Sequence, residues 1–356
     1  MLMPLSELDR KFLDDLLAAP SPSGYEQPIQ DVVRAYAAGF AETVTTDRHG
    51  NVMACVNPQG QVRIMLAGHC DQIGLIVKNI DEKGFIWVQT IGGWDPMVLL
   101  GQRVQVWTRS GPIPGIMARK PIHLQSPEDR KAVPEIKNLW VDIGALNGEE
   151  ARAAVRVGDV ITCELHQQTM RNGFVSGVAM DDKVGVWTVF TAARRAALQS
   201  PKAAIYAVST VQEEIGLRGV QTSAAAIRPQ IGLVTDVTHA TDCPTIDENQ
   251  HGRIKLGQGP VVYRGPNTNP RVFDLIEEEA AKHGIPYQLA SLGTPASNDA
   301  AQLQLAGDGV AMGLICIPNR YMHSPVEMVS LEDLDHAANL MAAFCVRIQD
   351  DTNLIP

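Results

Sequence analysis

Runs of apolar residues, many of them β-branched, recur along the chain and end abruptly in polar residues. Four stand out, at "VRIMLAG" (residues 62–68), "AAIYAVST" (203–210), "IGLVTD" (231–236) and "VAMGLICIP" (310–318). Continuous apolar runs of this length are typical of strands buried on both faces of a sheet. Between them, residues 181–200 and 270–284 repeat apolar side chains at helical spacing, with a proline and a glycine at the ends of the second stretch. The pattern predicts an α/β fold.

Residues 74–165 follow a different pattern. Short alternating segments such as "GFIWVQTIGG", "QRVQVWTRSGPIPGIM" and "GDVITCEL" are separated by glycine and proline. Short strands with tight turns and little helix are typical of a small β-barrel. We therefore predict a barrel domain over residues 74–165, inserted into a discontinuous catalytic α/β domain made of residues 1–73 and 166–356.

The first 26 residues, "MLMPLSELDRKFLDDLLAAPSPSGYE", have the spacing of an amphipathic helix. Acidic residues interrupt its apolar positions, which a signal peptide does not allow. Ser6 and Asp9 resemble a capping pair at a helix start. We expect a helix that remains part of the folded protein.

Composition narrows the class of protein. The 356 residues are 45% hydrophobic and 20% charged, and the formal net charge is −10 with no block of lysine or arginine. An acidic chain of this kind is a poor partner for nucleic acid. The six cysteines form no Cys-x-x-Cys pair, which argues against a thiolate zinc site or a disulfide framework and favours a reducing compartment. The sequence contains no run of about twenty apolar residues, the length that a membrane-spanning helix needs. We expect a cytoplasmic protein.

Side chains that bind metals follow the apolar runs. They are His69 and Asp71, Asp181 and Asp182, Glu213 and Glu214, Asp236, and His323. Because the carboxyl ends of the strands in an open α/β sheet meet where ligands bind, these side chains are expected to converge. Imidazoles and carboxylates without a thiolate suit one or two zinc-like divalent cations.

The neighbouring glutamates also permit a glycoside hydrolase, in which two carboxylates flank the sugar bond at about 5 to 9.5 Å. Neighbouring residues on an extended strand point to opposite faces, so Glu213 and Glu214 would not form that pair. A metal ligand beside a general base therefore fits better, and the glycosidase becomes the minor alternative.

The segments "GHCDQIG", "AMDDKVG", "VQEEIGLRG", "TDVTHA" and "YMHSPVE" resemble the TET (tetrahedral) aminopeptidases, a family of dinuclear metallopeptidases that includes glutamyl aminopeptidases. The resemblance covers nearly the whole chain. It implies a zinc-exopeptidase fold, with a three-layer α/β/α catalytic domain and an inserted PDZ-like barrel used for dimerisation.

The resemblance also implies roles for individual residues. Five side chains would hold two metal ions, His69 and Asp236 at the first, Glu214 and His323 at the second, and Asp181 at both. Glu213 would be the general base. Asp71 would fix the tautomer of the His69 imidazole. The peptide bond between Asp181 and Asp182 would be cis.

The implied activity is the removal of N-terminal residues from short peptides with a free N-terminus, through a hydroxide that bridges two divalent cations. Zinc is the expected metal, with cobalt and manganese as alternatives. The implied partners are further copies of the chain, as dimers that assemble into a tetrahedral dodecamer, and neither nucleic acid nor a membrane. The alternatives are a dinuclear N-acyl deacylase or carboxypeptidase, and a non-catalytic assembly protein.

Three positions depart from the pattern of the family, and none is an implied ligand or base. Gln72 stands where glutamate is usual, Lys183 where arginine is frequent, and Asn298 where threonine is common. The sequence leaves open how these three residues affect the pocket. It also leaves open the preferred N-terminal residue of the substrate and the choice between dimer and dodecamer.

Overall fold

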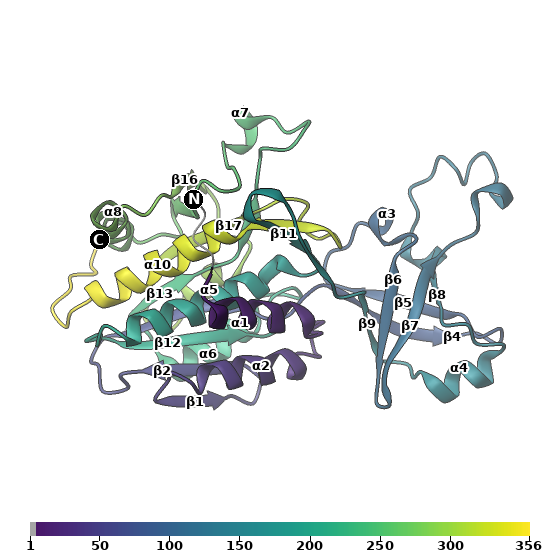
Figure 1. Cartoon of the computed structure of the whole chain (residues 1–356), viewed down its shortest axis with the longest axis horizontal. Coiled ribbons are helices and arrows are strands. Elements are labelled where there is room, and N and C mark those ends of the chain that lie inside the picture. The colour runs from purple at the N-terminus through teal and green to yellow at the C-terminus, as the bar shows by residue number, and fades with distance from the viewer. Residues whose placement is uncertain (1–4) are drawn as a thin grey trace.

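The protein has a larger lobe built on a sheet and a barrel at one end of it (Figure 1). The computed structural model describes residues 5–356, so the first four residues of the expected N-terminal helix lie outside the described residues. The two lobes are joined where β4 (Gly74–Ile80) leaves the large sheet region and β9 (Val160–Cys163) returns towards it.

The large sheet has nine strands in the order β1-β2-β12-β3-β13-β17-β15-β16, with β14 beside β17. At its centre, β12, β3, β13 and β17 are parallel neighbours. The bounds are β1 Thr43–Thr46, β2 Val52–Val56, β3 Arg63–His69, β12 Ala204–Thr210, β13 Ile231–Val234, β14 Val237–His239, β15 Val261–Arg264, β16 Gln288–Ser291 and β17 Ala311–Asn319. The four predicted strands form this centre, which confirms the prediction of an α/β fold.

Helices cover both faces of the sheet. Alternate side chains of β3 enter different cores, Ile64 and Leu66 one core, and Met65 and Ala67 the other. The first core also takes buried side chains from α1 (Glu7–Ala18), α2 (Gln27–Ala37), α5 (Met180–Ala197), α8 (Pro270–His283) and α10 (Leu331–Arg347). The second core takes them from α6 (Gly219–Ile227) and α9 (Asp299–Leu303). The sheet therefore lies between two helical layers.

The predicted barrel is confirmed as a closed barrel of six strands, in the order β4-β5-β8-β7-β6-β9. Its other strands are β5 Ile86–Ile91, β6 Arg103–Thr108, β7 Gly111–Ala118 and β8 Trp140–Asp142, and it carries the short helices α3 (Pro96–Leu99) and α4 (Gly148–Ala154). It has a hydrophobic core of its own. A small sheet of β10 (Gln167–Thr169), β11 (Phe174–Gly177) and β18 (Glu327–Ser330) follows the return to the larger lobe, and α7 (Glu248–His251) lies in a loop excursion (Figure 1).

Local signals in the sequence are confirmed at several helix ends. The Ser6 hydroxyl accepts a hydrogen bond from the Asp9 N–H, 3.1 Å away, at the start of α1. Gly284 ends α8 with φ +63°, a left-handed conformation that glycine adopts easily.

All six cysteines are free. Among residues 5–356, no helix has both the length and the apolar character needed to cross a bilayer.

Candidate metal centre

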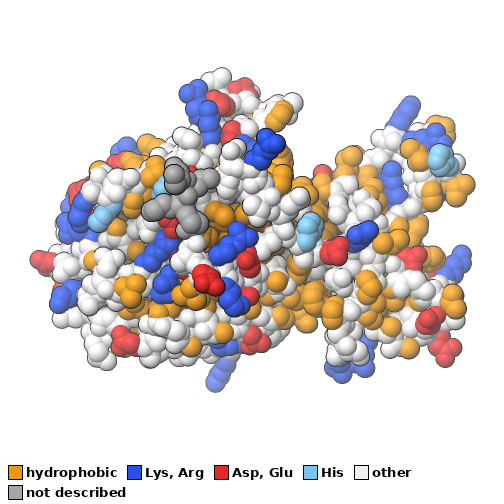
Figure 2. All heavy atoms as spheres, viewed as in Figure 1, with side chains coloured by type: hydrophobic (Ala, Val, Ile, Leu, Met, Phe, Trp, Pro, Cys, Tyr) orange, Lys and Arg blue, Asp and Glu red, His pale blue; other side chains and the backbone are white. Residues whose placement is uncertain are grey.

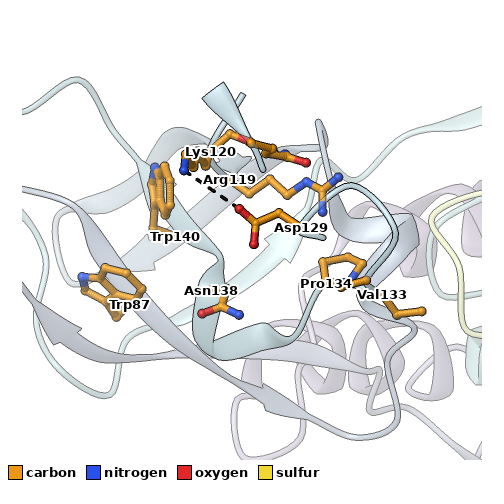
Figure 3. Close-up of a pocket in the computed structure, with 10 residues that line it drawn as sticks. Trp87, Arg119, Lys120, Asp129, Val133, Pro134, Asn138 and Trp140 are labelled. Atoms are coloured by element: carbon orange, nitrogen blue, oxygen red, sulfur yellow. Dashed lines mark hydrogen bonds and ion pairs between the residues drawn. The ribbon is translucent and has the colours of Figure 1, made fainter. Parts of the chain in front are cut away.

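Polar side chains line several cavities among the described residues, one in the larger lobe and one in the barrel among them. One, of about 650 Å³, lies at the carboxyl ends of the central strands, and all of the implied metal ligands line it together with Glu213. The other, of about 340 Å³, lies in the barrel between Trp87, Trp140 and the loop that carries Lys120 and Asp129 (Figure 3). In the barrel cavity, Lys120 and Asp129 form a loose ion pair at 4.0 Å. Only the first cavity brings together imidazoles and several carboxylates among the described residues, so it is the candidate site.

Two groups of three side chains in this cavity can each hold a metal ion, and Asp181 belongs to both. In the first group, His69 Nε2 lies 3.1 Å from Asp181 Oδ1 and 3.8 Å from Asp236 Oδ1. In the second group, His323 Nε2 lies 3.4 Å from Asp181 Oδ2 and 3.5 Å from Glu214 Oε2. The two carboxylate oxygens of Asp181 therefore face opposite imidazoles.

These five side chains come from separate segments that the sheet brings together. His69 is the last residue of β3, and Asp236 follows the end of β13. Asp181 lies in the first turn of α5, where its backbone departs from helical geometry and its peptide bond to Asp182 is cis, as the resemblance implied. Glu214 follows β12 and His323 follows β17. The parallel strands end at the same edge of the sheet, so the ligand residues that follow these strands lie at one opening, together with Asp181.

Glu213 lines the same cavity but belongs to neither group. Its Oε2 lies 3.9 Å from His69 Nε2, and the side chain is buried. Glu213 and Glu214 do not continue the strand β12, because the chain leaves it at Thr210 and Gln212 adopts φ +57°. The expectation that the two side chains point to opposite faces of a strand was therefore wrong, since both carboxylates reach one cavity.

Asp71 is fully buried beside the first group. His69 Nδ1 lies 3.0 Å from the main-chain oxygen of Asp71 and 3.5 Å from its carboxylate Oδ1, so the carbonyl is the closer partner. The Asp71 carboxylate accepts hydrogen bonds from the backbone N–H groups of Glu213 at 2.9 Å and Glu214 at 3.2 Å. It therefore holds the segment that carries both glutamates.

Burial and crowding shift the pKa values of the site. Burial raises the pKa of Glu213 to about 10 and that of Asp236 to about 7, and it raises the pKa of Glu214 as well. Burial has the same effect on Asp181, but hydrogen bonds from the two imidazoles outweigh it and hold the pKa of Asp181 below its usual value. Several carboxylates therefore lie close together in a buried space, where their negative charges repel one another. A divalent cation bound between them would offset this repulsion.

The donor set fits such cations. Glu214 Oε1 is buried and has no hydrogen-bond partner among the described residues, although it lies in a cavity lined by other polar groups. The described residues that line the cavity include no lysine or arginine to neutralise the four carboxylates. A buried carboxylate oxygen without a partner is costly unless an ion satisfies it. The residues therefore suit two divalent cations with oxygen and nitrogen ligands.

Comparison with known proteins agrees with this geometry. The family model of the M42 glutamyl aminopeptidases matches residues 50–340. The chain belongs to this family. It is 34% identical to the lysyl aminopeptidase of Pyrococcus furiosus over 341 residues, which cover 94% of this chain and 96% of that protein.

Two solved structures of TET peptidases share the fold. The TET aminopeptidase of a marine sediment Thaumarchaeota archaeon has a TM-score of 0.93 and 33% identity, over 98% of both chains. The TET1 peptidase of Pyrococcus horikoshii, which can assemble into a tetrahedron or a large octahedral shell, has a TM-score of 0.85 and 28% identity, over 96% of this chain and 100% of that one. These likenesses confirm the resemblance seen in the sequence, and family membership confirms a metal-dependent aminopeptidase over a glycoside hydrolase.

Three further carboxylates of this M42 member surround the ligands. Asp182 was expected at the site from the sequence, whereas Asp299 and Glu327 were given no role. Asp182 Oδ2 accepts a hydrogen bond from the His69 N–H at 3.2 Å, and Asp299 Oδ2 accepts one from the Thr210 hydroxyl at 2.6 Å. Glu327 accepts from the backbone of two ligand segments. Glu327 stands in the motif "YMHSPVE", four residues after His323, but nothing in the sequence shows that its carboxylate binds backbone N–H groups.

The three departures from the family pattern each have a local contact. Lys183 is fully buried, and its ammonium donates to the main-chain oxygen of Ala19 at 2.7 Å. Asn298 caps α9 by accepting a hydrogen bond from the Ala300 N–H at 3.2 Å. Gln72 is buried, and its side-chain oxygen accepts a long hydrogen bond from the Ser21 hydroxyl at 3.4 Å. Of the three, only Asn298 lines the cavity.

Proposed function

We propose that this protein is an aminopeptidase whose five ligand side chains hold two divalent cations. His69, Asp181 and Asp236 would hold the first cation, and Asp181, Glu214 and His323 the second. The observation that carries the proposal is the placement of Asp181, whose two oxygens face the two imidazoles at 3.1 and 3.4 Å, beside a carboxylate that belongs to neither group. When bound, the two cations supply Lewis acidity that polarises a peptide carbonyl and acidifies water. Ligands of this type accept zinc, cobalt or manganese, and we propose zinc.

Glu213 would move the proton that hydrolysis requires. Its carboxylate takes a proton from the attacking water as the bond from oxygen to the peptide carbon forms. It then gives this proton to the leaving nitrogen as the C–N bond breaks, so that the products are an amino acid and a shortened peptide. Burial raises the pKa of Glu213, so that its carboxylate binds a proton more readily than an exposed one, and two cations beside it would lower this pKa towards the range of a general base.

The substrate would carry a free N-terminal amine, whose neutral form could bind one of the two cations, and an uncharged side chain. Leu292, Pro295 and Met322 form part of the cavity wall, and Thr238 and Ser297 lie among them. These five side chains carry no charge, and the apolar ones contact an apolar substrate side chain favourably. We therefore propose an aliphatic N-terminal residue, unlike the lysine preference in the name of the Pyrococcus furiosus relative.

The barrel over residues 74–165 would be the dimerisation domain, as part of a tetrahedral dodecamer. Figure 2 shows hydrophobic side chains gathered on the visible face of the barrel and where it meets the larger lobe. The barrel exposes large apolar side chains, which include Met97, Ile116, Leu124, Leu146 and Val157. Exposed apolar surface of this kind is typical of interfaces between subunits. Sedimentation velocity would then show a particle much heavier than the 38.6 kDa chain, with no monomer at micromolar concentration.

The test of the activity is hydrolysis of aminoacyl-p-nitroanilides by protein loaded with zinc, cobalt or manganese. We expect leucyl-p-nitroanilide to be cleaved, and N-acetyl-leucyl-p-nitroanilide to be cleaved at least about 100-fold more slowly, because the acetylated nitrogen is blocked. Lysyl and glutamyl substrates are expected to react about 10-fold or more slowly than the leucyl substrate.

Each alternative has its own outcome in this panel. Faster release of acetate from N-acetyl amino acids would favour a deacylase, and release of C-terminal residues from peptides would favour a carboxypeptidase. Metal binding with no hydrolysis of any substrate would favour a non-catalytic protein.

A further inference from the structure

Glu327 is a buried carboxylate next to the metal centre that does not line its cavity. It is the first residue of β18, and it is 2% exposed. Its Oε2 accepts a hydrogen bond from the Asp181 N–H at 3.1 Å, and its Oε1 accepts one from the His323 N–H at 2.8 Å. Each oxygen of one carboxylate thus binds the backbone of a different ligand residue.

The two ligands bound in this way belong to the same group of three. Asp181 and His323, with Glu214, form the second group, and their side chains face one another at 3.4 Å. In the sequence they lie in segments far apart, at the start of α5 and in the turn after β17. Glu327 therefore joins two segments whose relative position decides the width of the second metal site.

His323 has a backbone conformation that needs such support. Its φ is +59°, in the left-handed region that residues with a side chain adopt rarely. A conformation of this kind persists only where the surrounding structure holds it. The hydrogen bond from the His323 N–H to Glu327 is one such contact.

We propose that Glu327 is the positioning residue of the second metal site, acting through the backbone of Asp181 and His323. This inference rests on the proposed dinuclear centre. Glu327 touches neither the cavity nor the reacting atoms, so it is neither a ligand nor a catalytic residue. Outer groups that orient metal ligands typically contribute 10- to 100-fold in metal affinity.

Carboxylates whose two oxygens bind two backbone N–H groups occur elsewhere among the described residues, both at the site and away from it. Asp71 binds the backbone N–H groups of Glu213 and Glu214 in the same way. Asp333, in α10, accepts from the N–H groups of Gly257 and Gly259, both at 2.7 Å, and neither glycine is next to a ligand. Asp333 is also fully buried, so it is a matched control for a carboxylate whose role is structural.

The test compares Glu327→Gln with Asp333→Asn in the full chain. The carboxamide of Glu327→Gln keeps the size of the side chain but has one acceptor oxygen, so one of the two backbone N–H groups faces an amide nitrogen instead. Metal-free protein is titrated with zinc by calorimetry and with cobalt by absorption spectroscopy. The thermal midpoint of each metal-free variant is measured alongside.

We expect the second equivalent of metal to bind Glu327→Gln at least about 10-fold more weakly than wild type. The first equivalent should change less, because His69 and Asp236 have no contact with Glu327. Asp333→Asn should have a lower thermal midpoint and bind both equivalents as wild type does.

The proposal is overturned if Glu327→Gln binds both equivalents with wild-type affinities. If Glu327→Gln does not fold by circular dichroism, Glu327→Asp, which is one methylene too short to reach both amides, is titrated in its place. Failure of both variants to fold, while Asp333→Asn folds, also overturns the proposal, because Glu327 would then be a structural residue. Wild-type protein that binds two equivalents but hydrolyses no aminoacyl substrate refutes the proposed function and leaves the role of Glu327 intact.

Discussion

Asp181 occupies the centre of the site. Some side chains around it face the cavity, and others accept hydrogen bonds from backbone N–H groups of the ligand segments. His69, Glu214, Asp236 and His323 face the cavity with Asp181. Asp71, Asp182 and Glu327 bind N–H groups of the ligand segments instead. Residues of the first kind were identified from residue type and position after a strand. Of the second kind, Asp71 and Asp182 were expected at the site, but their contacts with backbone N–H groups were not predicted and Glu327 was given no role, because a carboxylate that binds an amide has no distinctive sequence pattern.

Glu213→Gln separates the base from the ligands. Because Glu213 belongs to neither group of three, the variant is expected to bind both metal equivalents as wild type does, while kcat falls by about 100- to 10,000-fold. Metal content by elemental analysis and kcat on leucyl-p-nitroanilide are the two measurements. Glu214→Gln is the matched control and should lose affinity for metal. An exchange of the two results would mean that the base and the ligand have been assigned the wrong way round.

At the scale of elements, the position of His69 depends on how closely β3 packs against α5. A methyl group added at Gly68 would lie 2.7 Å from the backbone carbon of Gly185 and 2.8 Å from the nitrogen of Val186. Backbone atoms cannot move aside as a flexible side chain can. The strand that ends in His69 and the helix that begins at Met180 are thus held together at a glycine.

Gly68→Ala is therefore expected to destabilise the fold by about 1 to 3 kcal/mol, the range for overpacking a well-packed core. It should also weaken metal binding, because the end of β3 must shift away from α5. Thermal unfolding of the metal-free protein and a zinc titration measure the two effects. Gly293→Ala is the control, since a methyl group there meets no atom within 4 Å. Equal thermal midpoints for the two variants would contradict this account of the packing.

A buried ion pair joins α1 to α5 on the same face of the sheet. Asp9 is 3% exposed at its side chain and accepts from Arg194 at 2.6 Å and Arg195 at 3.2 Å. Burial raises the pKa of Asp9, but the hydrogen bond with Ser6 and the charges of the two arginines outweigh it, so its pKa lies below the usual value. A carboxyl group whose pKa is lowered by folding adds stability above its unfolded pKa and loses it as the pH falls through the folded pKa.

Asp9→Asn is thus expected to lower stability by about 2 to 3 kcal/mol at pH 7, less than for a fully buried pair because the guanidinium groups are partly exposed. The difference from wild type should shrink as the pH falls below about 4, because Asp9 of the unfolded chain then takes up a proton, and it should be lost once the pH falls below the lowered pKa of folded Asp9. Urea unfolding followed by circular dichroism from pH 3 to pH 8 measures it. Asp15→Asn, which removes an exposed partner of Lys11, should change stability by less than about 1 kcal/mol. A difference for Asp9→Asn that does not vary with pH would exclude the ion pair as its cause.

At the scale of the whole molecule, the metal centre joins segments from both ends of the chain, since β3 and the turn after β17 contribute His69 and His323. Cations that bind only where these segments meet stabilise the folded state by mass action. Metal binding at the site and the stability of the larger lobe are therefore thermodynamically linked.

Removal of metal with a chelator is expected to abolish hydrolysis and to lower the thermal midpoint, and added zinc should restore both. Each occupied site contributes about 4 kcal/mol when free metal exceeds Kd by 1,000-fold. Differential scanning fluorimetry with a series of zinc concentrations measures the shift. Glu213→Gln should show the wild-type shift, and Asp236→Asn a smaller one. Full activity in protein shown by elemental analysis to be free of metal would refute the metal-dependent function.

The sequence by itself determined the buried strands, the barrel between them and the residue types that meet at the strand ends. These follow from local patterns, because burial and ligand chemistry are properties of each side chain and its near neighbours in the chain. Only the tertiary structure decided that the chain leaves β12 before Glu213 and Glu214, and that Glu327 binds the backbone of Asp181, 146 residues away. Such arrangements depend on how remote segments pack and on turns such as the one at Gln212, and no local pattern encodes them.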